Sequence, residues 1–198
     1  MKHVHIPTEE KDFAKRLTIN ADVARRMLCG FIQDEMEKAG MSRAVIGLSG
    51  GIDSALSAYL AAEALGAENV LTVRMPYKTS SQDSLDDAEQ VIRALKLQAM
   101  TVPITDMADA LIGQFPDMNG LRRGNIMARL RMIVLYDQSA AFGGLVVGTS
   151  NKTEMLLGYS TIYGDSGVAL QPIGDLYKTQ VRQLAAALNI PTSVQTKA

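Results

Sequence analysis

The chain has 198 residues, of which 47% are hydrophobic and 21% are charged, and its formal net charge is −1. This length suffices for one domain with a substantial core. The near-balance of charge argues against a protein that relies on a basic surface to bind nucleic acid. No apolar run reaches the roughly 18 residues that a membrane-spanning helix needs. With Cys29 as the only cysteine, an intrachain disulfide, a Cys-x-x-Cys redox pair and a cysteine zinc cluster are all excluded.

The amino terminus, MKHVHIPTEEKDF, lacks the apolar region of a signal peptide, so we expect a cytoplasmic protein. We expect a single domain over residues 1–198, in which residues 1–19 form a mobile extension. Residues 20–39 carry apolar side chains at helical spacing, and Asn20 and Gly40 are suited to begin and end that helix. Cys29 lies on this apolar stripe and is expected to be a small buried hydrophobic residue.

Short apolar segments alternate with helical patterns along the rest of the chain. The segments that read as strands are 44–48, 69–75, 98–104 and 145–149. The segments that read as helices are 53–65, 84–95, 105–113, 125–141 and 175–188. This alternation predicts an α/β fold, a doubly wound parallel sheet of five strands with helices on both faces. Ligands of such folds bind outside the carboxyl ends of the strands.

The stretch VIGLSGGIDSALSAY, from Val45 to Tyr59, begins in the first predicted strand and permits two interpretations. Residues 47–51 fit the G-x-S-x-G nucleophile elbow of serine hydrolases. A hydrolase of this architecture needs a histidine after its nucleophile in chain order, but the only histidines are His3 and His5. The hydrolase interpretation is therefore weak, and the two histidines are expected to be solvated terminal residues.

A phosphate-binding loop fits the same stretch better. Gly50 and Gly51 carry no side chains, so backbone N–H groups can approach an anion. The helix that begins beside Asp53 would direct its positive end at the same place, where Ser49 and Ser54 add hydroxyl donors. Asp53 would repel a bare phosphate, but it suits a Mg²⁺ ion bound between them. On these residues alone, a glycine turn capped by Asp53 and Ser54 stays an open alternative.

The hexapeptide SGGIDS, residues 49–54, resembles the pyrophosphate loop of the ATP pyrophosphatases, which cleave ATP between the α and β phosphates and transfer AMP to a substrate oxygen. Over residues 20–198 the chain resembles the NAD synthetases of that group. The motifs that carry this resemblance are NIMARLRM at 125–132, GTSNKTE at 148–154, YGDSG at 163–167 and PIGDLYKTQVRQL at 172–184. The resemblance implies a Rossmann-like fold of the adenine nucleotide alpha-hydrolase type. It also implies an ammonia-dependent amidation of deamido-NAD to NAD through an adenylated intermediate, with release of AMP and pyrophosphate.

The resemblance also implies roles for individual residues. The residues implied to lie along the nucleotide and its phosphates are Gly47, Leu48, Ser49, Gly50, Gly51, Ile52, Asp53 and Ser54. Asp53 and Glu154 would bind Mg²⁺, while Arg74, Thr149 and Lys178 would contact ATP. Arg129 and Asp165 would contact deamido-NAD. The residues implied to act in catalysis are Asp53, Glu154, Asp165 and Lys178.

The chain departs from the family pattern at two places. Ile162 stands where several members carry a lysine that contacts deamido-NAD. The chain also ends at PTSVQTKA, where the family continues into further substrate-binding residues. We therefore expect the chain to be a truncated form that binds ATP but turns over poorly or not at all.

The implied partners are deamido-NAD, ATP and ammonia, with a separate glutaminase as another source of nitrogen, and neither a nucleic acid nor a membrane is implied. The family forms homodimers, and the stripe at 20–39 suits either a dimer surface or ordinary core packing. Two other functions stay open: a second amidating synthetase of the GMP synthetase type, and a non-catalytic protein that binds an adenine nucleotide.

Overall fold

The computed structural model describes residues 15–197, so His3 and His5 lie outside the described part of the chain. Four strands form one sheet in the order β3-β2-β1-β4, and every neighbouring pair is parallel. The strands are β1 (Ala44–Gly47), β2 (Val70–Arg74), β3 (Gln98–Thr101) and β4 (Leu145–Val147). The helices are α2 (Ala21–Lys38), α3 (Ile52–Leu65), η1 (Ala67–Asn69), α4 (Gln82–Leu95), α5 (Thr105–Ile112), α6 (Gly120–Phe142), α7 (Lys152–Leu157), α8 (Lys178–Ala187) and α9 (Thr192–Thr196).

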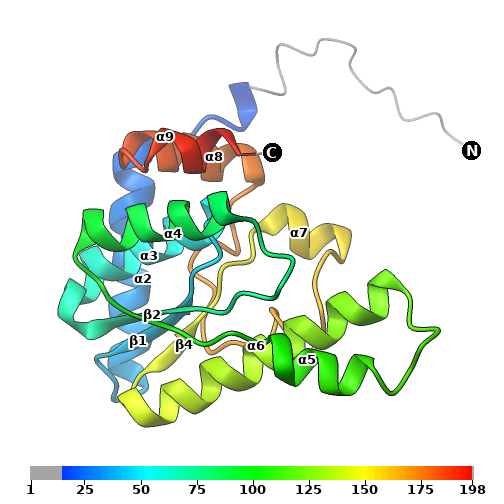
Figure 1. The fold of residues 1–198 in the computed structure, drawn as a ribbon. Helices are drawn as coiled ribbons and strands as arrows, with labels where there is room; N and C mark the ends of the chain where they lie inside the picture. Colours follow the sequence, from blue (N-terminus) through cyan, green and yellow to red (C-terminus); the bar gives the residue numbers. More distant parts are fainter. Residues whose placement is uncertain (1–14, 198) are drawn as a thin grey trace, which may run out of the picture.

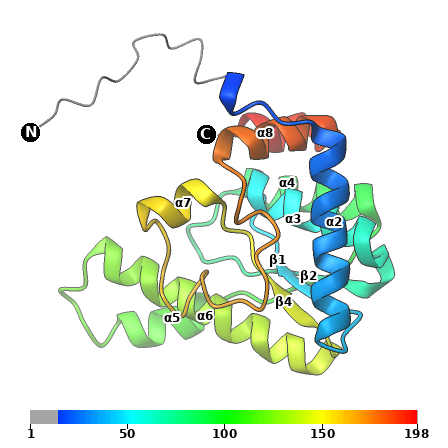
Figure 2. The same ribbon diagram turned by 180° about the vertical axis from the view of Figure 1, so that it is seen from behind.

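Helices cover both faces of the sheet, as the sequence predicts. Figures 1 and 2 show α5 and α6 on one side of the sheet and α3, α4 and α8 on the other. Side chains of β1 alternate between the two faces, as in any strand. Ala44 and Ile46 join a core cluster that includes Leu56 of α3 and Leu184 of α8. Val45 joins a second cluster on the opposite face, which includes Val134 of α6.

The expected fifth strand is absent from residues 15–197, so the prediction of five strands is wrong. The segment beside β4 makes only an isolated bridge, between Val147 and Leu170. The N–H of Ala169 donates to Val146 O (2.9 Å) and the N–H of Gly148 donates to Leu170 O (2.8 Å). Pro172 lies two residues after Leu170 and has no N–H with which to extend a ladder. The sheet therefore ends at β4.

Several element boundaries also differ from the prediction. The helix expected from residue 125 begins at Gly120, because the side chain of Asn119 accepts a hydrogen bond from the N–H of Arg122 and caps it. The helix expected from 175 begins at Lys178, and the strand expected to reach 104 ends at Thr101. At α2 the prediction is confirmed: Asn20 caps the helix, and Gly40 follows its end with a φ of +66°.

The apolar stripe of α2 is divided between the core and the surface. Cys29, Ile32 and Met36 are buried, whereas Met27 and Phe31 stay exposed. The expectation for Cys29 is confirmed: the side chain is buried, its thiol donates to Leu60 O, and burial raises the pKa of the thiol to about 11. Within residues 15–197, no helix has the length and apolar character that crossing a membrane requires.

Both described ends of the chain are anchored to helices. Near the first end, the N–H of Ile19 donates to Gln183 Oε1 of α8 (3.1 Å), and Gln183 Nε2 donates to Leu17 O (3.0 Å). At the other end, Lys197 Nζ lies 2.8 Å from Oδ2 of Asp87, a buried residue of α4. These contacts hold segments far apart in the sequence on the same side of the sheet.

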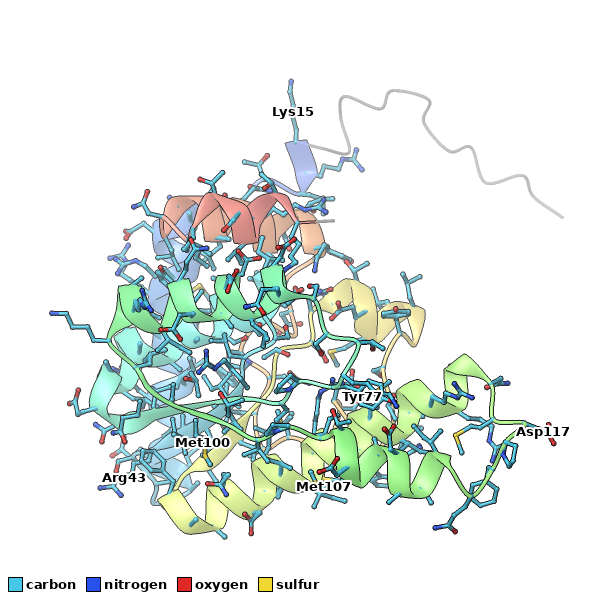
Figure 3. All side chains as sticks on the ribbon, in the orientation of Figure 1. Lys15, Arg43, Tyr77, Met100, Met107 and Asp117 are labelled. Atoms are coloured by element: carbon cyan, nitrogen blue, oxygen red, sulfur yellow. The ribbon has the colours of Figure 1, made fainter. Side chains whose placement is uncertain are left out.

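The segment that connects β2 to α4 is anchored to α5. Tyr77, labelled in Figure 3, lies over α5, and its hydroxyl donates to Asp109 Oδ1 (2.7 Å). Lys78 Nζ lies 2.6 Å from the other oxygen of the same carboxylate. These bonds place the chain that leaves β2 beside the α6 face of the sheet, where it borders the cavity described next.

Candidate active site

Two loops meet at the carboxyl end of the sheet. Strands β1 and β4 are parallel neighbours, with Ile46 opposite Val147, so the turns that follow them lie side by side. The first turn leads from β1 into α3, and the second leads from β4 into α7. Ligands of open α/β sheets bind at this edge, and all of the strongest sequence candidates lie on these two turns or face them.

The first turn is held by glycine geometry and serine hydroxyls. Gly50 has a φ of +79°, and a Cβ built on it would lie 2.1 Å from Ser84 O, so no other residue fits without displacing α4. Ser54 Oγ accepts from the N–H of Ser49 (3.2 Å) and donates to Gly51 O (3.0 Å). Ser49 Oγ accepts in turn from the N–H of Gly51 (3.2 Å). The two serines therefore shape the loop itself.

The amino terminus of α3 carries no side-chain cap. Gly51 stands at the N-cap position, and the first helical bond runs from the N–H of Ala55 to Gly51 O. The N–H groups before Ala55 have no acceptor within the helix, and they carry the positive end of the helix dipole. This arrangement is suited to receive an anion.

The second turn is closed by its own side chains. Asn151 and Glu154 form a capping box: Asn151 Oδ1 accepts from the N–H of Glu154 (3.1 Å), and Glu154 Oε2 accepts from the N–H of Asn151 (3.2 Å). Gln171 also holds this turn, because its Oε1 accepts a hydrogen bond from the N–H of Ser150 (3.2 Å). Side chains thereby occupy the N–H groups of Asn151 and Glu154, the N–H of Lys152 donates to Leu176 O (2.9 Å), and the turn presents a carboxylate.

Asp53 joins the two turns. Its Oδ1 accepts from Asn151 Nδ2 (2.9 Å), and its Oδ2 forms an ion pair with Lys178 at the start of α8. The N–H of Lys178 donates to Thr153 Oγ1 (3.0 Å), which ties α8 to α7. Three segments distant in sequence thus converge on one carboxylate.

Glu154 lies in a negatively charged, partly desolvated position. Burial is the main cause that raises its pKa above the usual value, and the charges of Asp53 and Asp165 act in the same direction. The hydrogen bond from the backbone of Asn151 and the charge of Lys178 oppose this shift without cancelling it. An added cation near Glu154 would relieve the surplus of negative charge.

Two adjoining cavities open at these turns. The larger has a volume of about 580 Å³, and its lining includes Gly47, Leu48, Arg74 and Arg131. The smaller, of about 200 Å³, is lined by Asp53 and Glu154 among others. The residues that line both cavities are Ser49, Thr149, Tyr159 and Asp165. The larger is of the size usual for small-molecule sites, and the smaller is polar.

The structure brings most of the sequence candidates together. Arg74 lines the larger cavity and pairs through Nη1 with Glu89 Oε2 (2.9 Å). Asp165 faces both cavities, and its Oδ1 accepts from the N–H of Thr161 (2.7 Å). Gly50 and Ile52 shape the first turn without lining either cavity.

Arg129 is placed differently from the other candidates. Its side chain is exposed and lines neither cavity, and its Nε donates to Ile162 O (3.3 Å). Ile162 itself is 67% exposed. Arg129 therefore supports the loop that follows α7, at the position where the sequence departs from the family pattern.

Two residues at the site were missed from the sequence. Arg131 lines the larger cavity and donates through Nε to Met75 O (3.1 Å), and burial lowers the pKa of its guanidinium. Residues two apart on a helix face different sides, so only one of Arg129 and Arg131 can face the cavity, and the spacing alone does not say which. Asn151 is the second missed residue, although Asn-x-x-Glu before a helix resembles the capping-box signal.

The donor set of the smaller cavity fits Mg²⁺. Among residues 15–197 no group of three or more His, Cys, Asp or Glu side chains is arranged to hold a metal ion. Mg²⁺ in nucleotide sites is commonly bound by one or two carboxylates together with phosphate oxygens and water, so a larger cluster is unnecessary. Asp53 and Glu154 supply two hard oxygen ligands beside an uncapped helix terminus, which is where a phosphate would lie.

A glycine turn at an uncapped helix, a carboxylate pair beside it and an adjoining cavity define an α/β protein with a nucleotide-type site at the carboxyl ends of its strands. The family model for NAD synthase matches residues 24–198, so the chain belongs to the NAD synthase family.

Known proteins resemble the chain throughout this range. The NH(3)-dependent NAD(+) synthetase of Trichlorobacter lovleyi is 59% identical over 182 residues, which cover 92% of this chain and 67% of that protein. The solved NH3-dependent NAD synthetase of Campylobacter jejuni, in complex with nitrate, is 42% identical with a TM-score of 0.86, and the match covers 90% of this chain and 78% of that one. The glutamine-dependent NAD+ synthetase of Acinetobacter baumannii, in complex with ADP, is 33% identical with a TM-score of 0.87. This match covers 91% of this chain and 36% of that one. The chain spans about two thirds of the length of the curated relatives it matches.

Proposed function

We propose that the protein is an ammonia-dependent NAD synthetase, a ligase that converts deamido-NAD to NAD with ATP and releases AMP and pyrophosphate. Relatives with this activity in their names, up to 59% identical to the chain, support the proposal. The observation that carries it is that two turns of opposite charge preference lie side by side at the carboxyl ends of β1 and β4. An uncapped helix terminus suited to an anion lies beside two carboxylates suited to a cation.

The proposed reaction has two steps. The nicotinate carboxylate of deamido-NAD attacks the α-phosphorus of ATP, and the bond to the β-phosphate breaks to release pyrophosphate. Ammonia then attacks the carbonyl carbon of the resulting adenylate, and AMP leaves with the bonding electrons to give the amide of NAD. The first step is required because a free carboxylate is a poor acylating group. Catalysis in such transfers consists mainly of positioning and charge neutralisation.

In this proposal the first turn binds the phosphates. The free N–H groups at the start of α3 and the backbone around Gly50 would hold the pyrophosphate, while Lys178 would turn from Asp53 toward a phosphate oxygen. The adenosine would occupy the larger cavity, between Arg74 and Thr149. An ADP-bound relative supports a nucleotide at this family's site.

The metal in this proposal is Mg²⁺, held by Asp53 and Glu154. Bound there, it would supply charge neutralisation on the triphosphate. The protein's own part is to fix the two carboxylates: Asp53 through Asn151 and Lys178, and Glu154 through the capping box. Removal of Mg²⁺ with EDTA is expected to abolish NAD formation.

The loop that follows α7 is the proposed deamido-NAD side of the site. Asp165 faces both cavities, and Arg129 holds the loop through the carbonyl of Ile162. With isoleucine in place of a lysine, binding of the dinucleotide depends more heavily on these two residues. Free ammonia or a separate glutaminase would supply the nitrogen, and a homodimer, with the exposed side of α2 as one candidate surface, completes the proposal.

A single-turnover assay tests the proposed function, because it detects even a slow reaction. The protein, in excess over ATP, is mixed with Mg²⁺, ammonium and either deamido-NAD or xanthosine monophosphate, and AMP, pyrophosphate and NAD are quantified. We expect AMP and NAD to form in equal amounts, with deamido-NAD only. AMP formed only with xanthosine monophosphate would assign a synthetase of the GMP type. ATP bound without pyrophosphate release in either mixture, both by this chain and by a form extended to the length of the curated relatives, would indicate a non-catalytic nucleotide-binding protein.

A further inference from the structure

Asn151 connects the two turns of the site through hydrogen bonds to Glu154 and Asp53. Its side chain is completely buried, with 0% exposed. Its Oδ1 accepts from the N–H of Glu154, its own N–H donates to Glu154 Oε2, and its Nδ2 donates to Asp53 Oδ1, at distances of 2.9 to 3.2 Å. One residue therefore hydrogen-bonds both of the carboxylates assigned to the metal.

Within residues 15–197, the other asparagines that cap helices, Asn20 and Asn119, show no such second connection. Asn20 and Asn119 also accept an N–H from the first turn of their helices, at 3.1 and 3.0 Å, but both are exposed. In Asn151 the amide end reaches across to Asp53, a residue 98 positions earlier in the chain. A cap needs only the oxygen of the side chain, so the bond from the nitrogen calls for a separate explanation.

We propose that Asn151 is a positioning residue for the cation site, which orients Asp53 and Glu154 toward a common ion; this inference rests on the metal role in the proposed function. The bond from Nδ2 occupies Oδ1 of Asp53 and holds the carboxylate with its other oxygen, Oδ2, against Lys178, in a residue that lines the smaller cavity. The capping box fixes the carboxylate of Glu154 at the same time. Partners that orient metal ligands in this way typically alter metal affinity by 10- to 100-fold when they are removed.

Serine and threonine at position 151 separate the two roles of this residue. Both are good helix caps, so their hydroxyl oxygens can accept the N–H of Glu154. Both are too short to reach Asp53 and therefore lose the bond to its Oδ1. A residue that is only a cap would be rescued by Asn151→Ser and Asn151→Thr, whereas a positioning residue would not.

The test measures metal binding without turnover. Mn²⁺ binding is titrated by electron paramagnetic resonance in the presence of α,β-methylene-ATP, and thermal unfolding is followed by circular dichroism. For Asn151→Ser and Asn151→Thr we expect the midpoint of unfolding to stay close to that of the wild type, while the Kd for Mn²⁺ rises by about 10-fold or more. The matched control is Asn20→Ser, the same exchange at an exposed cap, for which we expect an unchanged Kd.

A coupling measurement sharpens the test. If Asn151 acts through Asp53, Asn151→Ser should have little further effect on Mn²⁺ binding once Asp53→Asn is present. Unchanged Mn²⁺ affinity in the serine and threonine variants would make Asn151 only a cap. Failure of both to fold while Asn20→Ser folds would also overturn the proposal, because the bond from Asn151 to Asp53 would then be required for folding and not for metal binding.

The wild type separates this inference from the proposed function. Wild-type protein that binds Mn²⁺ with the nucleotide but makes no NAD would overturn the proposed function and leave the role of Asn151 to the variants. A wild type that binds no Mn²⁺ in the presence of the nucleotide would overturn the role of Asn151 itself.

Discussion

The turns after β1 and β4 are neighbours in the sheet and connect to helices in the same way, but their chemistry is opposite. After β1, Gly50 and Gly51 leave the N–H groups at the start of α3 without a side-chain partner. After β4, Asn151 and Glu154 occupy two of the donors at the start of α7 with their own oxygens. The first turn can accept an anion, whereas the second excludes one and offers negative charge instead.

This difference lies in the residue at the N-cap of each helix, which is Gly51 in α3 and Asn151 in α7. A glycine leaves the positive end of the helix free for a ligand, and an asparagine satisfies it internally. Placed on adjacent parallel strands, the two kinds of turn put an anion site next to a carboxylate pair, and Asp53 connects them. Four substitutions test this contrast.

The largest effect is expected from Asp53→Asn, which removes the charge that connects the two turns. Asparagine keeps the size of the side chain, but it cannot pair with Lys178 or neutralise a bound cation. We expect the single-turnover rate of AMP formation to fall about 1,000-fold, equivalent to about 4 kcal/mol in the barrier. The free energy of unfolding should change by less than about 1 kcal/mol, because the partner lysine is partly solvated.

A matched control for this substitution lies on the next helix of the same layer. Asp83 holds the second position of α4, as Asp53 does in α3, but it faces solvent and neither cavity. Asp83→Asn should leave the rate unchanged. If Asp53→Asn kept wild-type activity and an unchanged dependence on Mg²⁺, the metal role of Asp53 would be wrong.

The next effect is expected from Glu154→Gln, which keeps the cap and removes the charge. Gln180 shows that glutamine serves at this position, because its Oε1 accepts from the N–H of Tyr177 (2.9 Å) at the start of α8. We expect the rate of AMP formation to fall about 100-fold, since a ligand to the cation is lost. The midpoint of thermal unfolding should stay within a few degrees of the wild type. A large loss of stability with little loss of rate would show that Glu154 acts mainly as a helix cap.

Of the two turns, only the first could be predicted in detail from the sequence. The first turn was predicted because its determinants are local: two glycines, two serines and an aspartate stand within six residues, 49–54. The roles of Asn151 and Arg131 depend instead on contacts across the sheet, with Asp53 and Met75. Sequence spacing does not reveal such contacts.

The sheet gives a similar lesson. All four strands and both covered faces were predicted, because short apolar segments alternate with helical patterns along the chain. The fifth strand was not formed, because Pro172 stops the segment beside β4 after a single bridge. The start of α6 was placed five residues late, because its cap, Asn119, precedes the apolar pattern that marked the helix.

A smaller effect is expected from Gly50→Ala, which tests the backbone of the first turn. The added methyl group meets Ser84 O at 2.1 Å, and a φ of +79° is itself unfavourable for alanine. We expect a loss of about 2 kcal/mol in the free energy of unfolding, measured by urea titration. Gly143→Ala is the control, since Gly143 has a φ of +70° with no atom within 4 Å of the added group. Its cost should be near 1 kcal/mol, and equal costs at both positions would rule out the steric contribution from α4.

The smallest effect is expected from Ser54→Ala, and a second serine of α3 provides its control. Ser54 Oγ accepts from the N–H of Ser49 and donates to Gly51 O, so its loss leaves a donor and an acceptor of the first turn without this partner. We expect a cost of about 1 kcal/mol in the free energy of unfolding and a several-fold weaker affinity for ATP, because the loop loses its shape.

Ser57 lies nearly one helical turn further on and is fully buried, but its hydroxyl makes no hydrogen bond with any residue from 15 to 197. Ser57→Ala removes a buried polar group that gains nothing in the folded state, so it should be neutral or stabilising and leave ATP affinity unchanged. Equal costs for the two substitutions would mean that Ser54 contributes only as a small buried side chain, and its hydrogen bonds would then not be needed to shape the first turn.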